Sequence, residues 1–431
     1  MNVHKKALII TYYWPPAGGP GVQRWLKFVK YLPDYGIEPI VYCPENPNYP
    51  ITDNSLIDEV SKDITILKQP IHEPYRFANL LSKKTSKQIS SGVIPKQKKQ
   101  TLIQKLMLYI RGNYFIPDAR KNWIQPSVNF LSDYIIKHEI DTVISTGPPH
   151  SLHVIGLQLK KKHNINWLAD FRDPWTTIGY HKQLKLTRSS AERHKYLESK
   201  VLQSADQILV TSANTKKEFE SKTKQPITVI TNGYDVHGVE KPEKDLKFTL
   251  SHIGSLLSER NPLQLWEALS ELVKENSAFS EVFELKLIGV VSSDILQVLN
   301  EYGLTRHVNT IGYVSHEEAI RAQMSSRVLL LIEIDTEDTK VIIPGKLFEY
   351  MVSDTPILAV GPKNSDVETI LKSTNTGEYF YYDQKQAIKS QILSYFEAYK
   401  SNSLQVHAIG LQQYSRKALT NLLANVIKDK R

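Results

Sequence analysis

The sequence contains a single cysteine, Cys43, among its 431 residues. An internal disulfide and a cysteine-rich zinc site are therefore excluded, and a reducing compartment is the easier expectation. Long hydrophobic runs are also lacking, because the longest candidates, such as residues 328–332, are far shorter than the roughly 18 residues of a membrane span. The apolar run that starts at residue 7 has no small-residue cleavage site after it, so we expect a first strand there and no signal peptide.

Two common signatures of nucleotide and metal sites are missing as well. No Asp-x-Asp triplet occurs, which removes the usual carboxylate seat for a catalytic divalent ion. Gly19-x-Gly21 imitates the start of a dinucleotide fingerprint, but Arg24 stands where that motif needs its third glycine. A Walker lysine is absent too, so neither nucleotide motif applies.

The positive charge of the chain is local. The net charge is +9, and residues 81–130 alone hold ten Lys or Arg against one acid. Residues 246–405 hold 14 basic and 21 acidic residues, a net of −7, which leaves +16 for the remainder. One half of the molecule is therefore basic and the other acidic, which favours different partners for the two halves.

Short β-rich runs alternate with segments of helical period almost throughout, which predicts parallel sheets covered by helices on both faces. Because 431 residues exceed the roughly 250–300 at which single cores stop growing, two domains are expected. A charged segment at 239–245 without apolar period reads as the linker. The expected strands are 7–12, 39–43, 64–67, 142–145, 166–169, 207–211 and 227–230, then 248–253, 285–288, 308–311, 328–332 and 356–360.

The loop after the first expected strand, residues 12–21, leads into a helix and contains Gly18 and Gly19. Glycines let backbone N–H groups approach a ligand, and a helix N-terminus favours an anion such as a diphosphate. A tight strand-to-helix turn without any ligand explains the same residues, because Gly and Pro punctuate any turn.

Two later strand ends in the first domain carry polar side chains. His150 follows one strand, where it can position or share a proton with a substrate hydroxyl; helix capping or a surface hydrogen bond is the alternative. Asp170, Arg172 and Asp173 follow the next strand. Their charges bind a polar substrate or pair with one another.

The second domain offers two comparable places. Arg260 lies between a strand end and a helix expected to begin at a proline, where its forked guanidinium suits a phosphate; a solvated arginine is the alternative. Lys346 and Glu349 supply a cation and a carboxylate at the start of another helix. At i, i+3 spacing they can also form an ordinary surface salt bridge.

Taken together and in this order, these pieces resemble the retaining family-4 glycosyltransferases of the GT-B fold, particularly those that build bacterial capsule, exopolysaccharide or lipopolysaccharide. The resemblance covers nearly the whole chain. It is carried by segments 13–19, 116–120 with Trp123, 145–150, 170–175, 232–235, 254–262 and 344–356.

The resemblance implies an α/β protein with two doubly wound Rossmann-like domains that face each other across a cleft. The acceptor-side domain would comprise residues 1–240 plus 406–431, including a last helix that crosses back onto it. Residues 246–405 would form the nucleotide-sugar domain. The implied activity is retaining, metal-independent transfer of a sugar from a nucleotide-diphosphate sugar to a glycan or lipid-linked glycan acceptor, with no further cofactor.

Carried over residue by residue, the resemblance places Gly18 and Gly19 beside the donor diphosphate and His150 beside the transferred sugar. Arg260 and Lys346 would neutralise the leaving diphosphate, and Glu349 would hold the ribose. These four side chains, His150, Arg260, Lys346 and Glu349, are the implied catalytic set. The further candidate substrate-binding residues are Asp118, Arg120, Asp170, Arg172 and Asp173.

The sequence departs from the family pattern at two positions. The first carboxylate of the family's Glu-x7-Glu motif falls at Val341, for which Glu337 or Asp338 is a candidate substitute, and Ser255 stands where many members have arginine. A nucleotide-sugar epimerase of the same fold and a non-catalytic glycan-binding or scaffold protein with a degenerate donor site are therefore alternatives.

The basic stretch combines lysines with an apolar helical face at residues 102–110, which suits an anionic membrane surface. We expect a cytoplasmic protein held peripherally on the inner face of the plasma membrane, with a polyprenyl-diphosphate-linked acceptor; a solvated loop is the alternative. Nucleic acid is not an expected partner, because no aromatic platforms are interleaved with the cations. The lysines of this predicted patch are Lys83, Lys84, Lys87, Lys96, Lys98, Lys99 and Lys105.

Overall fold

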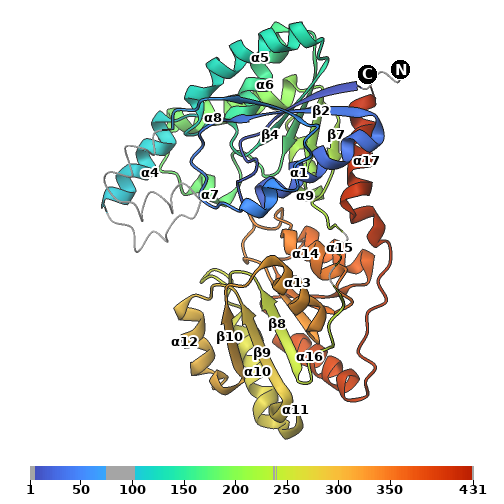
Figure 1. The fold of residues 1–431 in the computed structure, drawn as a ribbon. Helices are drawn as coiled ribbons and strands as arrows, with labels where there is room; N and C mark the ends of the chain where they lie inside the picture. The colour runs from blue at the N-terminus through green and yellow to red at the C-terminus, as the bar shows by residue number, and fades with distance from the viewer. Residues whose placement is uncertain (1–4, 74–101, 236–237, 239, 430–431) are drawn as a thin grey trace. The chain divides into compact units, whose positions relative to one another are not determined.

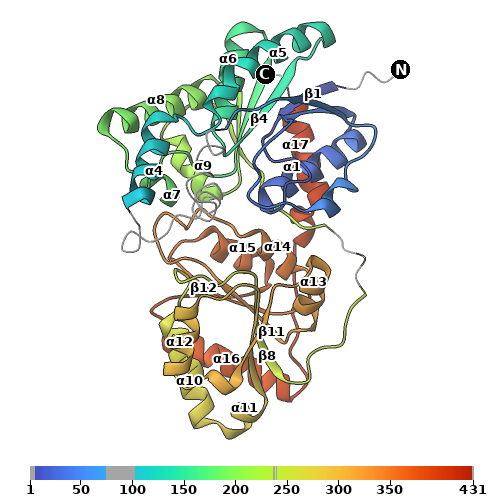
Figure 2. The same cartoon turned by 60° about the vertical axis from the view of Figure 1, so that its left-hand side comes forward.

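The computed structural model describes residues 5–73, 102–235, 238 and 240–429. Contacts divide the chain into two compact units: unit 1 is Met1–Asn232 with Arg416–Arg431, and unit 2 is Gly233–Ser415 (Figures 1 and 2). The boundaries expected from the sequence, at 240, 246 and 405, stay predictions.

Unit 1 is built on a seven-stranded parallel sheet with the strand order β3-β2-β1-β4-β5-β6-β7. The order reverses between β1 and β4, and in such sheets ligands bind beyond the carboxyl ends of the strands at this reversal. The strands are β1 Lys5–Ile10, β2 Ile37–Pro44, β3 Thr65–Gln69, β4 Thr142–Gly147, β5 Asn166–Phe171, β6 Gln207–Val210 and β7 Ile227–Val229.

Helices cover both faces of this sheet. Ala7 and Ile9 of β1 pack in one core with α1 and α17, whereas Leu8 and Ile10 pack in a second core with α5, α6 and α8 (Figure 1). This division follows from the alternation of side chains along a strand. The helices are α1 Pro20–Tyr31, α4 Leu102–Tyr114, α5 Ile124–His138, α6 Ser151–Lys162, α7 Gly179–Lys182, α8 Arg188–Ser204, α9 Ala213–Glu220 and α17 Arg416–Lys428, with 3-10 helices at Leu32–Tyr35, Asn54–Ile57 and Lys121–Trp123.

Unit 2 repeats this design on a six-stranded parallel sheet with the order β10-β9-β8-β11-β12-β13. Its strands are β8 Phe248–Ile253, β9 Phe283–Ile288, β10 Val308–Gly312, β11 Val328–Ile332, β12 Ile357–Gly361 and β13 Gly377–Tyr381. One face packs against α10, α12 and α16, and the other against α14 and α15 (Figure 2). The helices are α10 Leu263–Glu275, α11 Ser277–Val282, α12 Ser293–Glu301, α13 His316–Ser325, α14 Gly345–Met351, α15 Asp366–Thr374 and α16 Lys385–Lys400, with 3-10 helices at Thr305–His307 and Leu411–Tyr414.

The predicted fold class is confirmed: each unit is a Rossmann-like parallel sheet with helices on both faces. One strand was missed, the edge strand β13. Its residues are mostly half-buried, so it lacks the fully apolar run that identifies a central parallel strand. Its aromatic residues, Tyr379 to Tyr381, were the available signal.

Candidate functional site

In unit 2, a lysine of helix α14, Lys346, contacts the backbone at the end of strand β8. Gly254 follows the strand with a φ of +113°, a conformation that side chains other than glycine rarely adopt. A Cβ at Gly254 would lie 3.4 Å from Lys346 Nζ. The positive φ therefore requires glycine at this turn, and the lysine amine lies in contact distance of it.

Arg260 and Lys346 form what we call the two-cation site. Lys346 Nζ donates a hydrogen bond to Ile253 O (3.0 Å) and lies 3.2 Å from His252 Nε2. Burial, and then the charge of Arg260, lower the pKa of Lys346 to about 7. Among the described residues, no carboxylate forms an ion pair with either cation, although the charge of Arg260 acts on the nearby Glu333 carboxyl. Two half-buried positive groups without an ion-paired acid form an electrostatic arrangement that an anionic ligand satisfies.

Glu349 lies on the same helix but has a different partner. Its carboxylate accepts a hydrogen bond from Gln323 Nε2 (3.1 Å) on α13, so it is not consumed by a surface pair with Lys346. The side chain borders a hollow of about 160 Å³. The lining residues are Tyr234, Asp235, Ile320, Gln323, Met324, Glu349, Val352 and Ser353.

Glu333 is a buried acid near this site that the sequence reasoning did not select. It directly follows β11 and is only 4% exposed. Its carboxylate accepts hydrogen bonds from Tyr379 Oη (2.7 Å) and Ser365 Oγ (3.0 Å). Burial raises the pKa of Glu333 to about 7, against the opposing charge of Arg260. An acid immediately after an entirely apolar strand was the available signal.

The positions around Val341 show a different arrangement. Glu337, a candidate substitute for the missing carboxylate, is exposed and pairs with Lys340 at 2.8 Å. Glu333 is thus the buried carboxyl group whose pKa responds to Arg260, although it lies eight residues before Val341.

In unit 1, His150 occupies the position before helix α6 but does not cap it through its side chain. The imidazole is 6% exposed and stacks on Trp175, with ring centroids 4.6 Å apart and planes 5° apart. Burial, and then the neighbouring His153, hold the pKa of His150 well below its ordinary value, so the ring is neutral at pH 7. Neither ring nitrogen has a hydrogen-bond partner within the described part of the chain. This leaves a buried, uncharged imidazole whose two nitrogens have no hydrogen-bond partner in the described part of the chain.

Asp118 performs the capping that His150 does not. Its carboxylate accepts hydrogen bonds from Ser151 N (2.8 Å) and Ser151 Oγ (3.0 Å) at the start of α6. Arg120 is engaged elsewhere: it pairs with Glu73 at 2.9 Å and lies 4.3 Å from the ring centre of Tyr12. Both predicted substrate contacts therefore also have structural work within unit 1.

Asp170 is fully buried and holds Arg24. Its carboxylate accepts hydrogen bonds from Arg24 Nη2 (2.9 Å), Trp25 Nε1 (2.8 Å) and Thr146 Oγ1 (2.8 Å). Burial alone would raise the pKa of Asp170, but the charge and hydrogen bonds of Arg24 lower it below the ordinary value. Arg24, at the position of the missing third glycine, thus anchors helix α1 to strand β5.

Arg172 joins two loops. Its guanidinium donates to Gly21 O (2.8 Å) at the start of α1 and to Pro148 O before α6. Asp173 beside it is half-buried. Burial raises the pKa of Asp173, and the charge of Arg172 opposes this rise. Of the two acids in this segment, Asp173 is the one with surface left for a ligand.

The two glycines of the first loop differ in what they offer. Gly18 N donates a hydrogen bond to Ile51 O (3.0 Å), so this N–H already has an acceptor within the protein. Gly19 has a φ of +89°, and a Cβ built there would meet nothing within 4 Å. Only the Gly19 side of this turn therefore faces open space for an approaching ligand.

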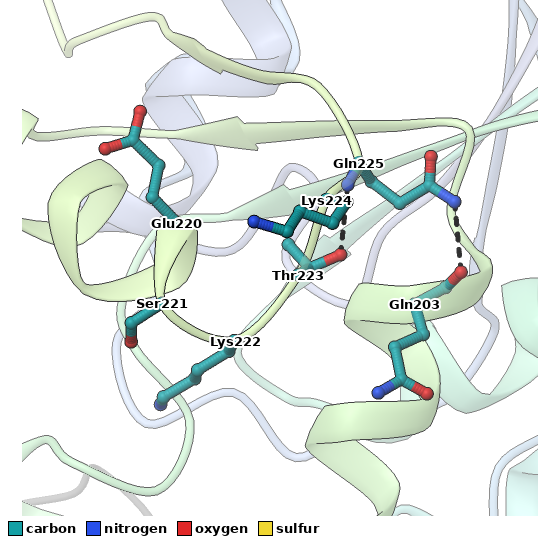
Figure 3. Close-up of a pocket in the computed structure, with 7 residues that line it drawn as sticks. All are labelled: Gln203, Glu220, Ser221, Lys222, Thr223, Lys224 and Gln225. Carbon is teal, nitrogen blue, oxygen red and sulfur yellow. Dashed lines mark hydrogen bonds between the residues drawn. The ribbon is translucent and has the colours of Figure 1, made fainter.

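A separate polar hollow of about 360 Å³ lies where α8 ends and α9 leads to β7 (Figure 3). Thr223 Oγ1 accepts from Gln225 N (3.1 Å), and Gln225 Nε2 donates to Gln203 O (3.1 Å). Lys222 is paired with Glu218 at 2.6 Å. These groups bond to one another, so the hollow is a polar turn at the surface of unit 1.

Six lysines of the predicted membrane patch, Lys83 to Lys99, lie outside the described residues. The seventh, Lys105, is on α4, where Leu102, Leu106, Tyr109 and Ile110 are exposed at the spacing of one helix face. No helix in the described ranges is both long and apolar enough to cross a bilayer. The apolar face of α4 is therefore a surface feature.

Comparisons with known proteins agree with this architecture. No protein-family model matches the sequence, and no curated protein does. Among solved structures, Anabaena Alr3699/HepE in complex with UDP has a TM-score of 0.61 at 11% identity, over 99% of this chain and 100% of that one. The lipopolysaccharide outer core galactosyltransferase WaaB has a TM-score of 0.55 at 14% identity, over 98% and 99%. A Listeria monocytogenes protein described as a UDP-N-acetylglucosamine 2-epimerase has a TM-score of 0.54 at 13% identity, over 98% and 95%.

At such identities the likeness establishes the fold. Both transferase and epimerase structures share it, so fold alone does not choose between these activities. With two parallel Rossmann-like sheets and these structural neighbours, the chain has the GT-B fold.

Proposed function

We propose that this protein is a retaining glycosyltransferase that moves a sugar from a nucleotide-diphosphate sugar to a glycan or lipid-linked glycan in cell-envelope polysaccharide biosynthesis. The observation that carries the proposal is the two-cation site: Arg260 and Lys346 lie near each other without a carboxylate partner among the described residues. A diphosphate supplies the negative charge that this site lacks.

The chemistry of glycosyl transfer makes use of such a site. When the sugar–phosphate bond breaks, negative charge develops on the departing nucleoside diphosphate, and fixed cations stabilise it more in the transition state than in the ground state. We propose that Arg260 and Lys346 take this role without a metal, in keeping with the lack of an Asp-x-Asp triplet. Glu349 would accept hydrogen bonds from the ribose hydroxyls.

The acceptor side is proposed to use unit 1. His150 presents a neutral imidazole with unbonded nitrogens, which suits hydrogen bonds with sugar hydroxyls. Asp173 is half-buried with a raised pKa, which suits a group that accepts a hydroxyl hydrogen bond. Gly19 would approach the diphosphate through its backbone.

We further propose that the protein binds an anionic membrane surface peripherally. The exposed apolar face of α4 carries Leu102, Leu106 and Ile110 next to the basic stretch of the sequence. Apolar insertion combined with cationic attraction is the usual basis of such binding. Co-sedimentation with vesicles should need anionic lipid and weaken with salt; binding that ignores both would contradict this part of the proposal.

Donor binding tests the main proposal directly. A thermal-shift screen with UDP-, GDP- and ADP-sugars should raise the melting temperature for at least one, because a ligand that prefers the native state stabilises it by about 2.7 kcal/mol at 100 times its Kd. The same compound should show slow hydrolysis or, with acceptor, transfer. Absence of binding to every nucleotide sugar would overturn the proposal.

A nucleotide-sugar epimerase is the second candidate, because the Listeria protein described as an epimerase shares this fold. It predicts an isomerised donor sugar in the absence of any acceptor. Nuclear magnetic resonance of the donor after incubation separates the two activities, since a transferase leaves the configuration of the unreacted sugar unchanged.

A further inference from the structure

Lys346 lies in surroundings that weaken its hold on a proton. Its Nζ contacts a carbonyl, Ile253 O, and an imidazole nitrogen, His252 Nε2, at 3.0 and 3.2 Å. The charge that acts on it is that of a second cation, Arg260. Burial without an anion favours the neutral amine, and an anion placed beside it favours the ammonium.

The imidazole of His252 has a defined role in this contact. The ring is fully buried, and its Nδ1 lies 3.1 Å from Leu330 O on β11. Because a carbonyl oxygen can only accept, Nδ1 carries the hydrogen. Burial, and then the charge of Lys346, hold the pKa of His252 well below its ordinary value, so the ring is neutral and Nε2 carries a lone pair. That lone pair faces Lys346 and can accept a hydrogen bond from it.

We propose that binding of a nucleotide sugar at the two-cation site takes up one proton on the amine of Lys346, and that His252 is the positioning residue that holds this amine. The inference rests on the proposed function. The proton comes from the buffer, and no bond in the sugar is made or broken in this step. The negative charge that the diphosphate brings to the site makes the ammonium of Lys346 the favoured form.

Several other titratable groups near the site form hydrogen bonds of their own, including Tyr382 Oη, which donates to Glu333 O (2.7 Å). Tyr350 Oη is bonded to Ile253 N (2.9 Å) and O (3.2 Å), and Glu349 is bonded to Gln323. Glu333 responds to Arg260, but both its oxygens are held by Tyr379 and Ser365. Because the pKa of Glu333 is also about 7, this carboxyl group is a second candidate for binding a proton when an anion arrives, and it needs its own control.

The expected pH dependence follows from the pKa of Lys346, about 7 in the free protein. Below pH 7 the amine is already charged, so binding is tightest and takes up little proton. At pH 8 binding should take up about 0.9 proton, and the affinity should fall up to tenfold per pH unit above 7. A nucleotide sugar suits this test, since its diphosphate is esterified at both ends and does not titrate near pH 7.

The experiment is isothermal titration calorimetry of the full chain with UDP-glucose, GDP-mannose and ADP-glucose, at pH 6 and pH 8, in two buffers of different ionisation enthalpy. The difference in heat between buffers measures the protons taken up. For the tightest of the three compounds we expect little uptake at pH 6 and close to one proton at pH 8.

Four variants assign the proton. Lys346→Arg keeps the positive charge permanently, so proton uptake at pH 8 should disappear, whereas Glu333→Gln should retain it. His252→Phe removes the acceptor nitrogen and should weaken binding roughly tenfold and move the pH profile to lower pH. His252→Gln, which can place an amide oxygen near Nε2, should restore much of both. His307→Gln is the matched control: His307 is also buried in unit 2, with Nδ1 3.4 Å from a strand carbonyl, Phe283 O.

The outcomes separate the two proposals. No binding of any nucleotide sugar at either pH contradicts the proposed function and this inference with it. Binding without proton uptake at pH 8, or uptake that survives Lys346→Arg, overturns the inference alone. If His252→Phe lowers only the melting temperature and leaves the pH profile in place, the positioning role of His252 is wrong.

Discussion

The two units treat positive charge at the carboxyl ends of their strands in opposite ways. In unit 1, Arg24 and Arg120 are buried and paired with Asp170 and Glu73. In unit 2, the two-cation site has no carboxylate partner among the described residues. A buried cation that is paired contributes to the structure, whereas we propose that the cations of unit 2 bind an anionic ligand. Similar sheets thus carry different chemistry.

The largest expected effect breaks the paired side of this comparison. Asp170→Asn removes the charge that Arg24 needs, and leaving a buried guanidinium uncompensated should lower the free energy of unfolding by about 3–5 kcal/mol. Urea denaturation, followed by tryptophan fluorescence, measures this loss. Asp173→Asn, three residues on and half-buried, is the matched control with a small effect. A loss below about 1 kcal/mol for Asp170→Asn would show that the pair is not structural.

The next largest effect is expected at the two-cation site, whose cations have no carboxylate partner among the described residues. Arg260→Ala should lower kcat/KM for the preferred nucleotide sugar about 10²- to 10³-fold, or about 2.7–4 kcal/mol, because it removes charge stabilisation in the transition state. The melting temperature should hardly change, since Arg260 pairs with no carboxylate in the described chain. Arg321→Ala, which breaks an exposed pair with Glu317 in the same unit, should leave kcat/KM intact. Equal kinetic losses in both variants would contradict the site.

The smallest expected effect concerns the buried histidines of unit 1 and the pH dependence of the free energy of unfolding. Burial lowers the pKa of His153 to about 3 and of His181 to about 4, so both are neutral in the folded protein near pH 7. Their unfolded pKa lies near 6.5, so below that pH the unfolded state binds more protons. The free energy of unfolding should then fall by about 1.4 kcal/mol per pH unit for each such histidine. Urea titrations between pH 7 and 5 measure the slope.

His153→Gln should reduce this slope by the share of one histidine, because it removes one buried proton acceptor. His163→Gln offers a control, since this histidine lies at the end of α6 and is only half-buried. An unfolding free energy that stays flat from pH 7 to 5 would mean that these rings already carry protons in the folded state.

The sequence was sufficient for the fold because parallel strands buried on both faces leave continuous apolar runs, as in residues 328–332. Arg260 and Lys346 could be selected as candidates because each lies next to a strand end or helix start that the pattern reveals. The bond between Arg24 and Asp170 was not, since the two are 146 residues apart and either could have met a ligand. Partners across such distances depend on strand order, which the hydrophobic pattern leaves open.

Burial of single side chains was equally beyond the pattern. Glu333 follows an apolar strand and looks like any acid at a strand end, until Tyr379 and Ser365 enclose it. His150 was expected as a capping or a substrate-facing residue, and only the packing of Trp175 shows that the ring is flat against an indole. Whether these residues contact a substrate stays a prediction.

The guanidinium of Arg172 has a mechanical consequence. It donates hydrogen bonds to the backbone of two loops: to Gly21 O, in the loop that carries Gly19, and to Pro148 O, in the loop that carries His150. A displacement of either loop must stretch or break the same side chain, so the two are expected to move as one body. The side chain also leaves little clearance, because a methyl group at Gly21 would come within 2.8 Å of Nη1. Gly21→Ala would therefore displace the Arg172 guanidinium and, through its bond to Pro148 O, the loop that carries His150, without contacting His150 itself.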